Sequence, residues 1–80
     1  MSMIKYVRRL KRIDALIFRK ATGTPEQFAE KLGIKRSTLY EILQEMRLLG
    51  VDIRYCSHRQ SFYYANERRI KVVIEAAAEY

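Results

Sequence analysis

The sequence predicts a small, mainly helical α+β domain in which three helices precede a β-hairpin. Three observations lead to this expectation. Apolar residues recur at helical spacing up to residue 49, glycines interrupt that pattern at turn positions, and the period changes to two after Gly50. Because 80 residues suffice for only one small core, we expect a single domain over residues 1–80.

Composition excludes several classes of protein. The chain is 49% hydrophobic and 31% charged, as is usual for a folded globular protein. Its apolar runs are too short for a membrane helix or a signal peptide, so we expect a cytoplasmic protein that does not span a membrane. Cys56 and His58 are the only cysteine and histidine, so we expect no disulfide, metal site or cofactor. Without a phosphate-binding glycine loop or a nucleophile–histidine set, we expect no enzyme.

Basic residues dominate the charge. The chain has 16 Lys+Arg against 9 Asp+Glu, a net charge of +7 and a pI near 9.9. The first twenty residues hold one acid, Asp14, and the cations Lys5, Arg8, Arg9, Lys11, Arg12, Arg19 and Lys20. This segment is either a solvated helix face or a face that contacts phosphates. A membrane-surface helix is disfavoured because the small core needs the same apolar residues.

The spacing of Tyr6, Leu10, Ile13 and Ile17 predicts a first helix over residues 4–20 with these side chains in the core. We expect Gly23 to end this segment.

A second helix is expected over residues 25–32. Thr24 is a suitable N-cap, and Pro25 fits the first helical position. Gln27 completes a capping box with Thr24, and Gly33 can adopt the left-handed conformation that ends a helix.

A third helix is expected over residues 36–49. Its core-facing residues are Leu39, Ile42, Leu43 and Met46. Gly50 is expected to be a left-handed C-terminal residue, with Val51 packed on Met46.

Alternating residues predict a hairpin over residues 51–65, with Cys56 opposite Ser61 and the turn at residues 58–59. In that register one face, expected to cover the helices, carries Ile53, Tyr55, Phe62 and Tyr64. The tail, residues 66–80, suits either a strand or a helix. We favour a third strand over residues 69–75, whose exposed edge is a hypothetical dimer surface.

Residues 25–44 meet the requirements of a helix-turn-helix. Ala29 is small where the next helix crosses, and Gly33 permits the turn. The apolar positions that lock the helices are Phe28, Leu32, Ile34, Leu39 and Ile42.

Residues 6–66 resemble the short winged helix-turn-helix proteins of bacteria. They are also similar to the N-terminal DNA-binding domains of DeoR-like and WYL-domain regulators. The stretches that carry the resemblance are 23–34, 36–43, 48–55 and 61–64. The resemblance implies sequence-specific binding to duplex DNA, with the third helix in the major groove and the hairpin as a wing on the backbone or minor groove.

Lys35 departs from the family, which often has a capping serine there. Either the cap is weaker, with Ser37 starting the helix two residues later, or Lys35 adds a phosphate contact.

The outward side of the third helix supplies the candidate DNA contacts. Arg36 suits guanine, Gln44 adenine and Glu41 cytosine. All base-contact candidates are Lys35, Arg36, Ser37, Tyr40, Glu41 and Gln44. The phosphate-contact candidates are Arg8, Arg9, Arg12, Thr24, Gln27, Thr38, Arg54, His58 and Arg59.

The favoured hypothesis is a small bacterial transcriptional regulator that binds double-stranded DNA at the nucleoid as a dimer or by assembly on DNA. No small-molecule effector is evident. One alternative is a protein–protein interaction module that uses the same face. The other is a single-strand binder, which would need residues 62–64 exposed for stacking.

Overall fold

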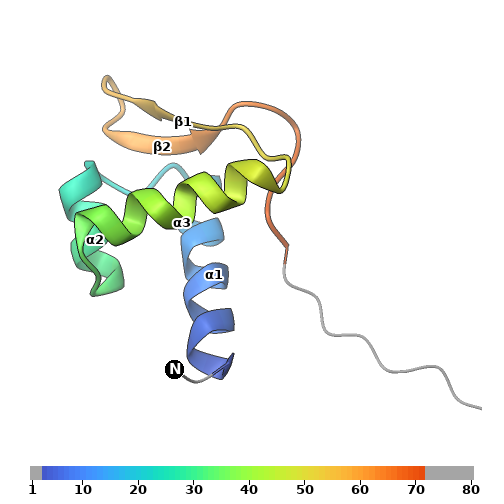
Figure 1. The fold of residues 1–80 in the computed structure, drawn as a ribbon. Coiled ribbons are helices and arrows are strands. Elements are labelled where there is room, and N and C mark those ends of the chain that lie inside the picture. Colours follow the sequence, from blue (N-terminus) through green and yellow to red (C-terminus); the bar gives the residue numbers. More distant parts are fainter. Residues whose placement is uncertain (1–2, 72–80) are drawn as a thin grey trace, which may run out of the picture.

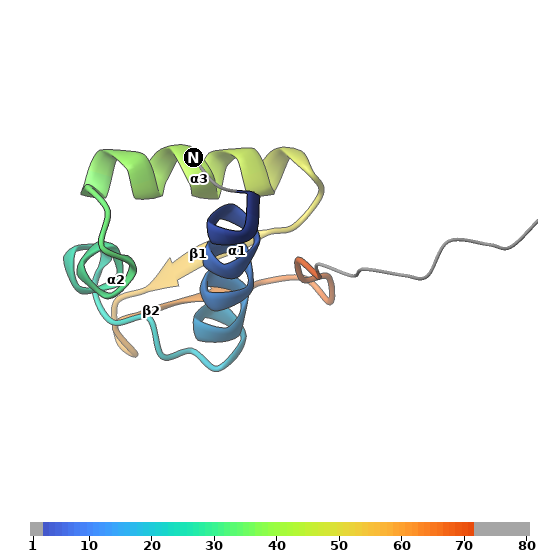
Figure 2. The same cartoon turned by 90° about the horizontal axis from the view of Figure 1, so that it is seen from below.

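The computed structural model describes residues 3–71, which form a mainly helical α+β arrangement (Figure 1). Along the chain the elements are α1 (Met3–Phe18), α2 (Pro25–Leu32), α3 (Arg36–Leu48), β1 (Ile53–Cys56) and β2 (Ser61–Tyr64). The strands form an antiparallel hairpin on one side of the helices (Figures 1 and 2). The predicted order of three helices and a hairpin is therefore confirmed.

The core lies where the helices meet the hairpin. Its fully covered side chains come from all five elements and from Val51. They are Ile13, Ile17, Phe28, Ala29, Leu39, Leu43, Met46, Val51, Ile53 and Phe62. The predicted core positions Leu32, Ile34 and Ile42 are half-buried at its rim.

Helix α1 ends at Phe18, two residues before the predicted limit. Lys20 adopts a left-handed conformation with a φ of 57°. The Lys20 and Ala21 amides then donate to the carbonyls of Ile17 and Leu16 at 3.0 and 2.9 Å. These hydrogen bonds form a helix C-terminal motif in which the left-handed residue is usually glycine. The sequence therefore predicted Gly23, and not Lys20, as the residue that ends this segment.

The first half of α1 projects beyond the other elements (Figure 1). The prediction that Tyr6 joins the core is wrong, because this residue is 46% exposed. Ile13 and Ile17, on later turns, are fully buried. Periodicity identifies an apolar face correctly but does not show how much of its length another element covers.

Both ends of α2 form as predicted. The Thr24 hydroxyl accepts from the Gln27 amide at 3.2 Å, and Gln27 Oε1 accepts from the Thr24 amide at 2.8 Å. Gly33 is left-handed, with φ 68° and ψ 32°, and begins the turn to α3. The axis of α2 makes a steep angle with that of α3, near the N-terminal end of α3 (Figure 2).

Helix α3 begins at Arg36, with Lys35 as an N-cap residue whose side chain makes no capping hydrogen bond. The later start at Ser37 is therefore wrong. The helix ends at Leu48, one residue early, and Gly50 has a φ of 106° as expected of a glycine turn. Beyond that turn Val51 is buried.

The hairpin has the predicted register, with Cys56 opposite Ser61 and Ile53 opposite Tyr64. Phe62 is buried and Tyr64 is half-buried, but Tyr55 is 36% exposed. The prediction of a core position for Tyr55 is therefore wrong. Its ring lies edge-on against Phe62 at 5.0 Å, outside the region that the helices cover.

Residues 65–71 form no strand. The predicted third strand is therefore wrong over residues 69–71, and its remainder, residues 72–75, lies outside the described residues. Side-chain contacts hold this segment instead of a strand ladder. Arg69 pairs with Asp14, and the Ile70 amide lies 3.4 Å from the Tyr64 hydroxyl.

Candidate nucleic-acid interface

The outward side of α3 is a polar surface on a firmly anchored helix. Leu39, Leu43 and Met46 are buried beneath it and hold the helix against the core. The Arg47 guanidinium also donates to the Ile53 carbonyl at 2.9 and 3.0 Å, which ties α3 to β1. Exposed on the opposite side are Lys35, Arg36, Ser37, Tyr40, Glu41 and Gln44. All six predicted base-contact candidates are therefore accessible.

Arg36 is the centre of a small surface network. Its Nη1 lies 3.3 Å from Glu26 Oε1, and its Nη2 donates to the Tyr40 hydroxyl at 3.4 Å. The guanidinium lies 5.6 Å from the Tyr40 ring centroid. The hydrogen bond to Tyr40 raises the pKa of Arg36 above its ordinary value. The network thus holds a permanently charged donor over the first turn of α3, and Glu26 is a partner that the sequence did not reveal.

The start of α3 favours an anion. The side chain of Lys35, the N-cap residue, makes no hydrogen bond to the amides of the first turn, which have no acceptor within the helix. Amides at a helix N-terminus carry partial positive charge and bind phosphate or carboxylate groups readily. Lys35 and Arg36 add full positive charges at the same place.

The polar candidates around α2 are already partly engaged. The Gln27 amide donates to Thr24, so the capping box uses one of the groups expected to meet phosphate. The Thr24 hydroxyl hydrogen and the Gln27 side-chain amide hydrogens remain donors. Thr38, in the first turn of α3, is half-buried.

The basic residues of α1 gather in one place. Lys5, Arg8, Arg9 and Arg12 line a shallow hollow of about 260 Å³ together with Leu32, the last residue of α2. Leu32 immediately precedes the turn to α3, so the hollow lies next to that turn. Arg8 and Arg12 are exposed and Arg9 is half-buried. This basic hollow brings together three of the predicted phosphate ligands and adds Lys5.

The hairpin candidates do not form one group. Arg54 pairs with Asp52 at 3.1 Å, and their hydrogen bond raises the Arg54 pKa. His58 is exposed in the turn. Arg59 lines a different hollow of about 130 Å³ with Lys20, Cys56 and Tyr63. Within residues 3–71, no ion pair or hydrogen bond links these hairpin cations to the outward residues of α3.

Two of the three aromatic residues at 62–64 offer little surface for stacking on bases. Phe62 is buried against Phe28, with ring centroids 5.7 Å apart. The Tyr64 hydroxyl donates to Asp14 at 2.8 Å, so its ring is held toward α1. Of residues 62–64, only the half-buried Tyr63 faces away from the helices.

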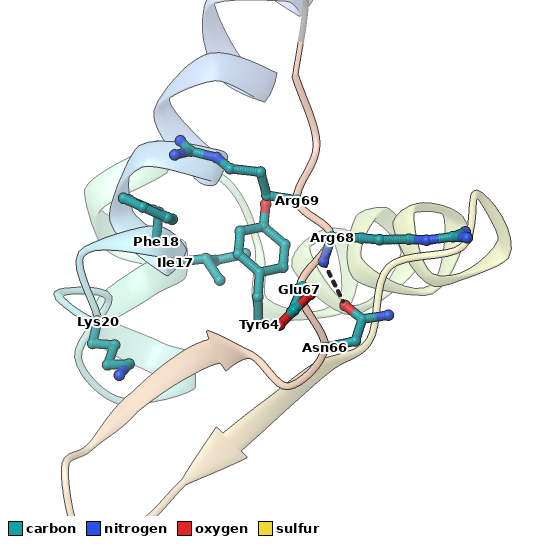
Figure 3. A pocket seen from close by; sticks show the side chains of 8 residues that line it. All are labelled: Ile17, Phe18, Lys20, Tyr64, Asn66, Glu67, Arg68 and Arg69. Atoms are coloured by element: carbon teal, nitrogen blue, oxygen red, sulfur yellow. Dashed lines mark hydrogen bonds between the residues drawn. The ribbon is translucent and has the colours of Figure 1, made fainter.

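A second polar cluster joins the last turns of α1 to β2 and to the segment that follows it. Asp14, 9% exposed, accepts from Tyr64 and from two nitrogens of Arg69, whose guanidinium also lies 3.7 Å from the Phe18 ring centroid. Beside it is an open hollow of about 480 Å³, lined also by Lys20 and residues 66–68 (Figure 3). The one available signal was that Asp14 is the only acid among seven cations and follows a core isoleucine.

Among residues 3–71 there is no group of three histidine, cysteine or acidic side chains placed to hold a metal ion. None of the helices in this part of the chain is long and apolar enough to cross a membrane.

Comparisons of the chain with protein-family models, with curated proteins and with solved structures find no match. Function is therefore inferred from the residues and their geometry.

Proposed function

We propose that this chain is a winged helix-turn-helix protein that binds double-stranded DNA in a sequence-dependent way. In this assignment α2, the turn and α3 are the helix-turn-helix, with α3 in the major groove. The β1–β2 hairpin is the wing, lying on the backbone or in the minor groove. In the cell the protein would be a small transcriptional regulator at the nucleoid.

The outward side of α3 is the observation that carries this proposal. A recognition helix needs donors and acceptors near its N-terminal end, on a helix that the core holds still. Arg36, Ser37 and Tyr40 meet the first requirement, and the buried leucines of α3 meet the second. Such residue types pair with base edges or phosphates.

Charge supports a nucleic acid over a protein as the partner. The basic hollow of α1 includes Leu32, just before the turn after α2, and the uncapped start of α3 follows that turn. Both features suit phosphate oxygens. The buried Phe62 and the tethered Tyr64 favour duplex over single-stranded DNA, since these two rings of β2 are not available for base stacking.

Fluorescence anisotropy with labelled random-sequence duplex and single-stranded DNA, titrated across salt, tests the proposal. We expect tighter binding to the duplex, with log K falling against log salt by about 0.9 per phosphate contact. No binding at about 50 mM salt would contradict the proposal, because counterion release is largest at low salt. That result would direct attention to a protein partner for the same face, and preference for single strands would favour the stacking hypothesis.

A further inference from the structure

One side of α1 carries a stripe of residues, and Arg69 contacts only the second half of this stripe. Met3, Val7, Asp14 and Phe18 recur at helical spacing and therefore lie on the same side of the helix. The second half of the stripe is partly occupied, because Arg69 bonds Asp14 and stacks on Phe18, which remains 58% exposed. The first half is open: Met3 is 80% exposed and Val7 is half-buried.

The open half is a hollow with an apolar floor and a basic rim. It measures about 290 Å³ and is lined by Met3, Ile4, Val7, Arg8 and Lys11. An apolar segment that also carries carboxylates complements such a surface, since aliphatic side chains would cover the floor and the acids would meet the rim.

The chain itself arrives at this stripe. Arg69 is anchored on its second half, Ile70 packs against the core, and Lys71 follows. Both views place this end of the described chain beside α1, and Figure 1 shows the first half of α1 continuing past it (Figures 1 and 2). From Asp14 to Met3 the helix is about 16 Å long. Residues 72–80 span up to about 30 Å when extended, which is enough to follow the stripe.

The sequence of residues 72–80 has the required chemistry. It begins with Val72, Val73 and Ile74, and its only charged side chains are Glu75 and Glu79. A second copy of α1 is a poorer occupant. Residues 3–12 carry five cations and no acid, so two such faces repel each other.

We propose that residues 72–80 dock on the first half of the α1 stripe of the same chain. Their aliphatic side chains cover Met3 and Val7, and the two glutamates face Lys11 and Arg8. This docking extends the contact that Arg69 begins. It does not depend on the protein binding DNA, so either proposal can fail alone.

Methyl NOEs in the full chain test the docking. We expect NOEs from the methyl groups of Met3 and Val7 to those of residues 72–74. An isotope-filtered sample, made by mixing labelled and unlabelled chains, distinguishes contacts within one chain from contacts between chains. Absence of these NOEs would overturn the proposal. NOEs seen only between chains would also overturn it, because the occupant would then be a second copy.

Charge reversal tests the proposed orientation. The double variant Glu75→Lys, Glu79→Lys should reduce the NOE intensities by about half or more at low salt, because the rim is basic. The control Glu30→Lys, Glu45→Lys makes the same charge change on exposed residues of α2 and α3. We expect the control to retain the NOEs, and equal losses in both variants would overturn the pairing of the glutamates with the rim.

Discussion

Arg36 meets Glu26 and Tyr40 in the free protein, yet this does not remove it from the proposed interface. The ion pair is exposed, with 54% and 78% of the two side chains accessible. Exposed pairs of this kind contribute little to stability and are screened by salt. The guanidinium can therefore exchange Glu26 for a base edge or a phosphate at small cost, while Tyr40 keeps it over the outward side of α3.

Replacement of Arg36 and Arg59 separates base contact from phosphate contact. We expect Arg36→Ala to cost about 1–3 kcal/mol on the preferred site and to relax sequence preference. Arg59→Ala should weaken all sequences alike and lower the salt slope by about one unit. Arg68→Ala, an exposed arginine outside the candidate set, is the control. Anisotropy on preferred and random duplexes measures all three, and identical behaviour of Arg36→Ala and Arg59→Ala would contradict the proposed orientation.

Tyr64 should make stability depend on alkaline pH. Burial, followed by the hydrogen bond to Asp14, raises the pKa of Tyr64 above its ordinary value. The neutral phenol is thus favoured in the folded state, so this contribution is complete below about pH 10 and declines as pH rises above it. We expect the urea midpoint to fall from pH 8 to pH 11 by less in Tyr64→Phe than in the parent protein. Tyr63→Phe is the control, and equal pH responses of both variants would contradict this assignment.

At the scale of elements, the corner between α2 and α3 sets the geometry of the proposed interface. The Ile34 amide donates to the Ala29 carbonyl and the Gly33 amide to the Glu30 carbonyl, both at 3.0 Å. These bonds close α2 while the left-handed Gly33 redirects the chain. The direction of α3 therefore depends on one backbone conformation.

Gly33 tests this dependence. A side chain here would meet no atom within 4 Å, so the penalty comes from the left-handed backbone alone. We expect Gly33→Ala to lower the free energy of unfolding by about 1–2 kcal/mol. Gly33→Asn should cost less, because asparagine tolerates this conformation better. Urea unfolding measures both, and an Asn variant no more stable than the Ala variant would contradict the backbone explanation.

At the scale of the whole molecule, buried hydrogen bonds join the loop between α1 and α2 to the hairpin. Thr22 is fully buried, and its hydroxyl accepts from the Phe62 amide at 2.9 Å and lies 3.2 Å from the Ser61 hydroxyl. This loop thus covers part of β2. The proposed interface gives each chain one recognition helix, and one such helix reads only a few base pairs.

For the proposed DNA binding, we therefore expect more than one copy on each specific site. We expect two chains on a duplex of about 20–24 bp, with half-sites about one helical turn apart. Sedimentation of the complex gives the stoichiometry, and a duplex of about 10 bp that holds a single half-site is the control. One chain per long duplex, bound without cooperativity, would contradict this prediction.

The local elements could be predicted from the sequence because neighbouring residues determine them. The capping box needs only Thr24 and Gln27, and the left-handed turn needs only Gly33. The hairpin register follows from alternation around a short turn, which places Cys56 opposite Ser61. The accessible side of α3 follows in the same way from its buried face.

Tertiary structure alone decided the features that join distant residues. Asp14 meets Arg69 across 55 positions and Thr22 meets Ser61 across 39, and no local pattern encodes such pairs. Side-chain anchoring of Arg69 also replaced the strand expected over residues 69–71. Tyr6 shares an apolar face with Ile13, yet burial depends on which elements reach that face. Neighbouring residues determine short-range hydrogen bonds and apolar periodicity. The burial of a side chain and the pairing of distant residues are decided only when the elements pack together.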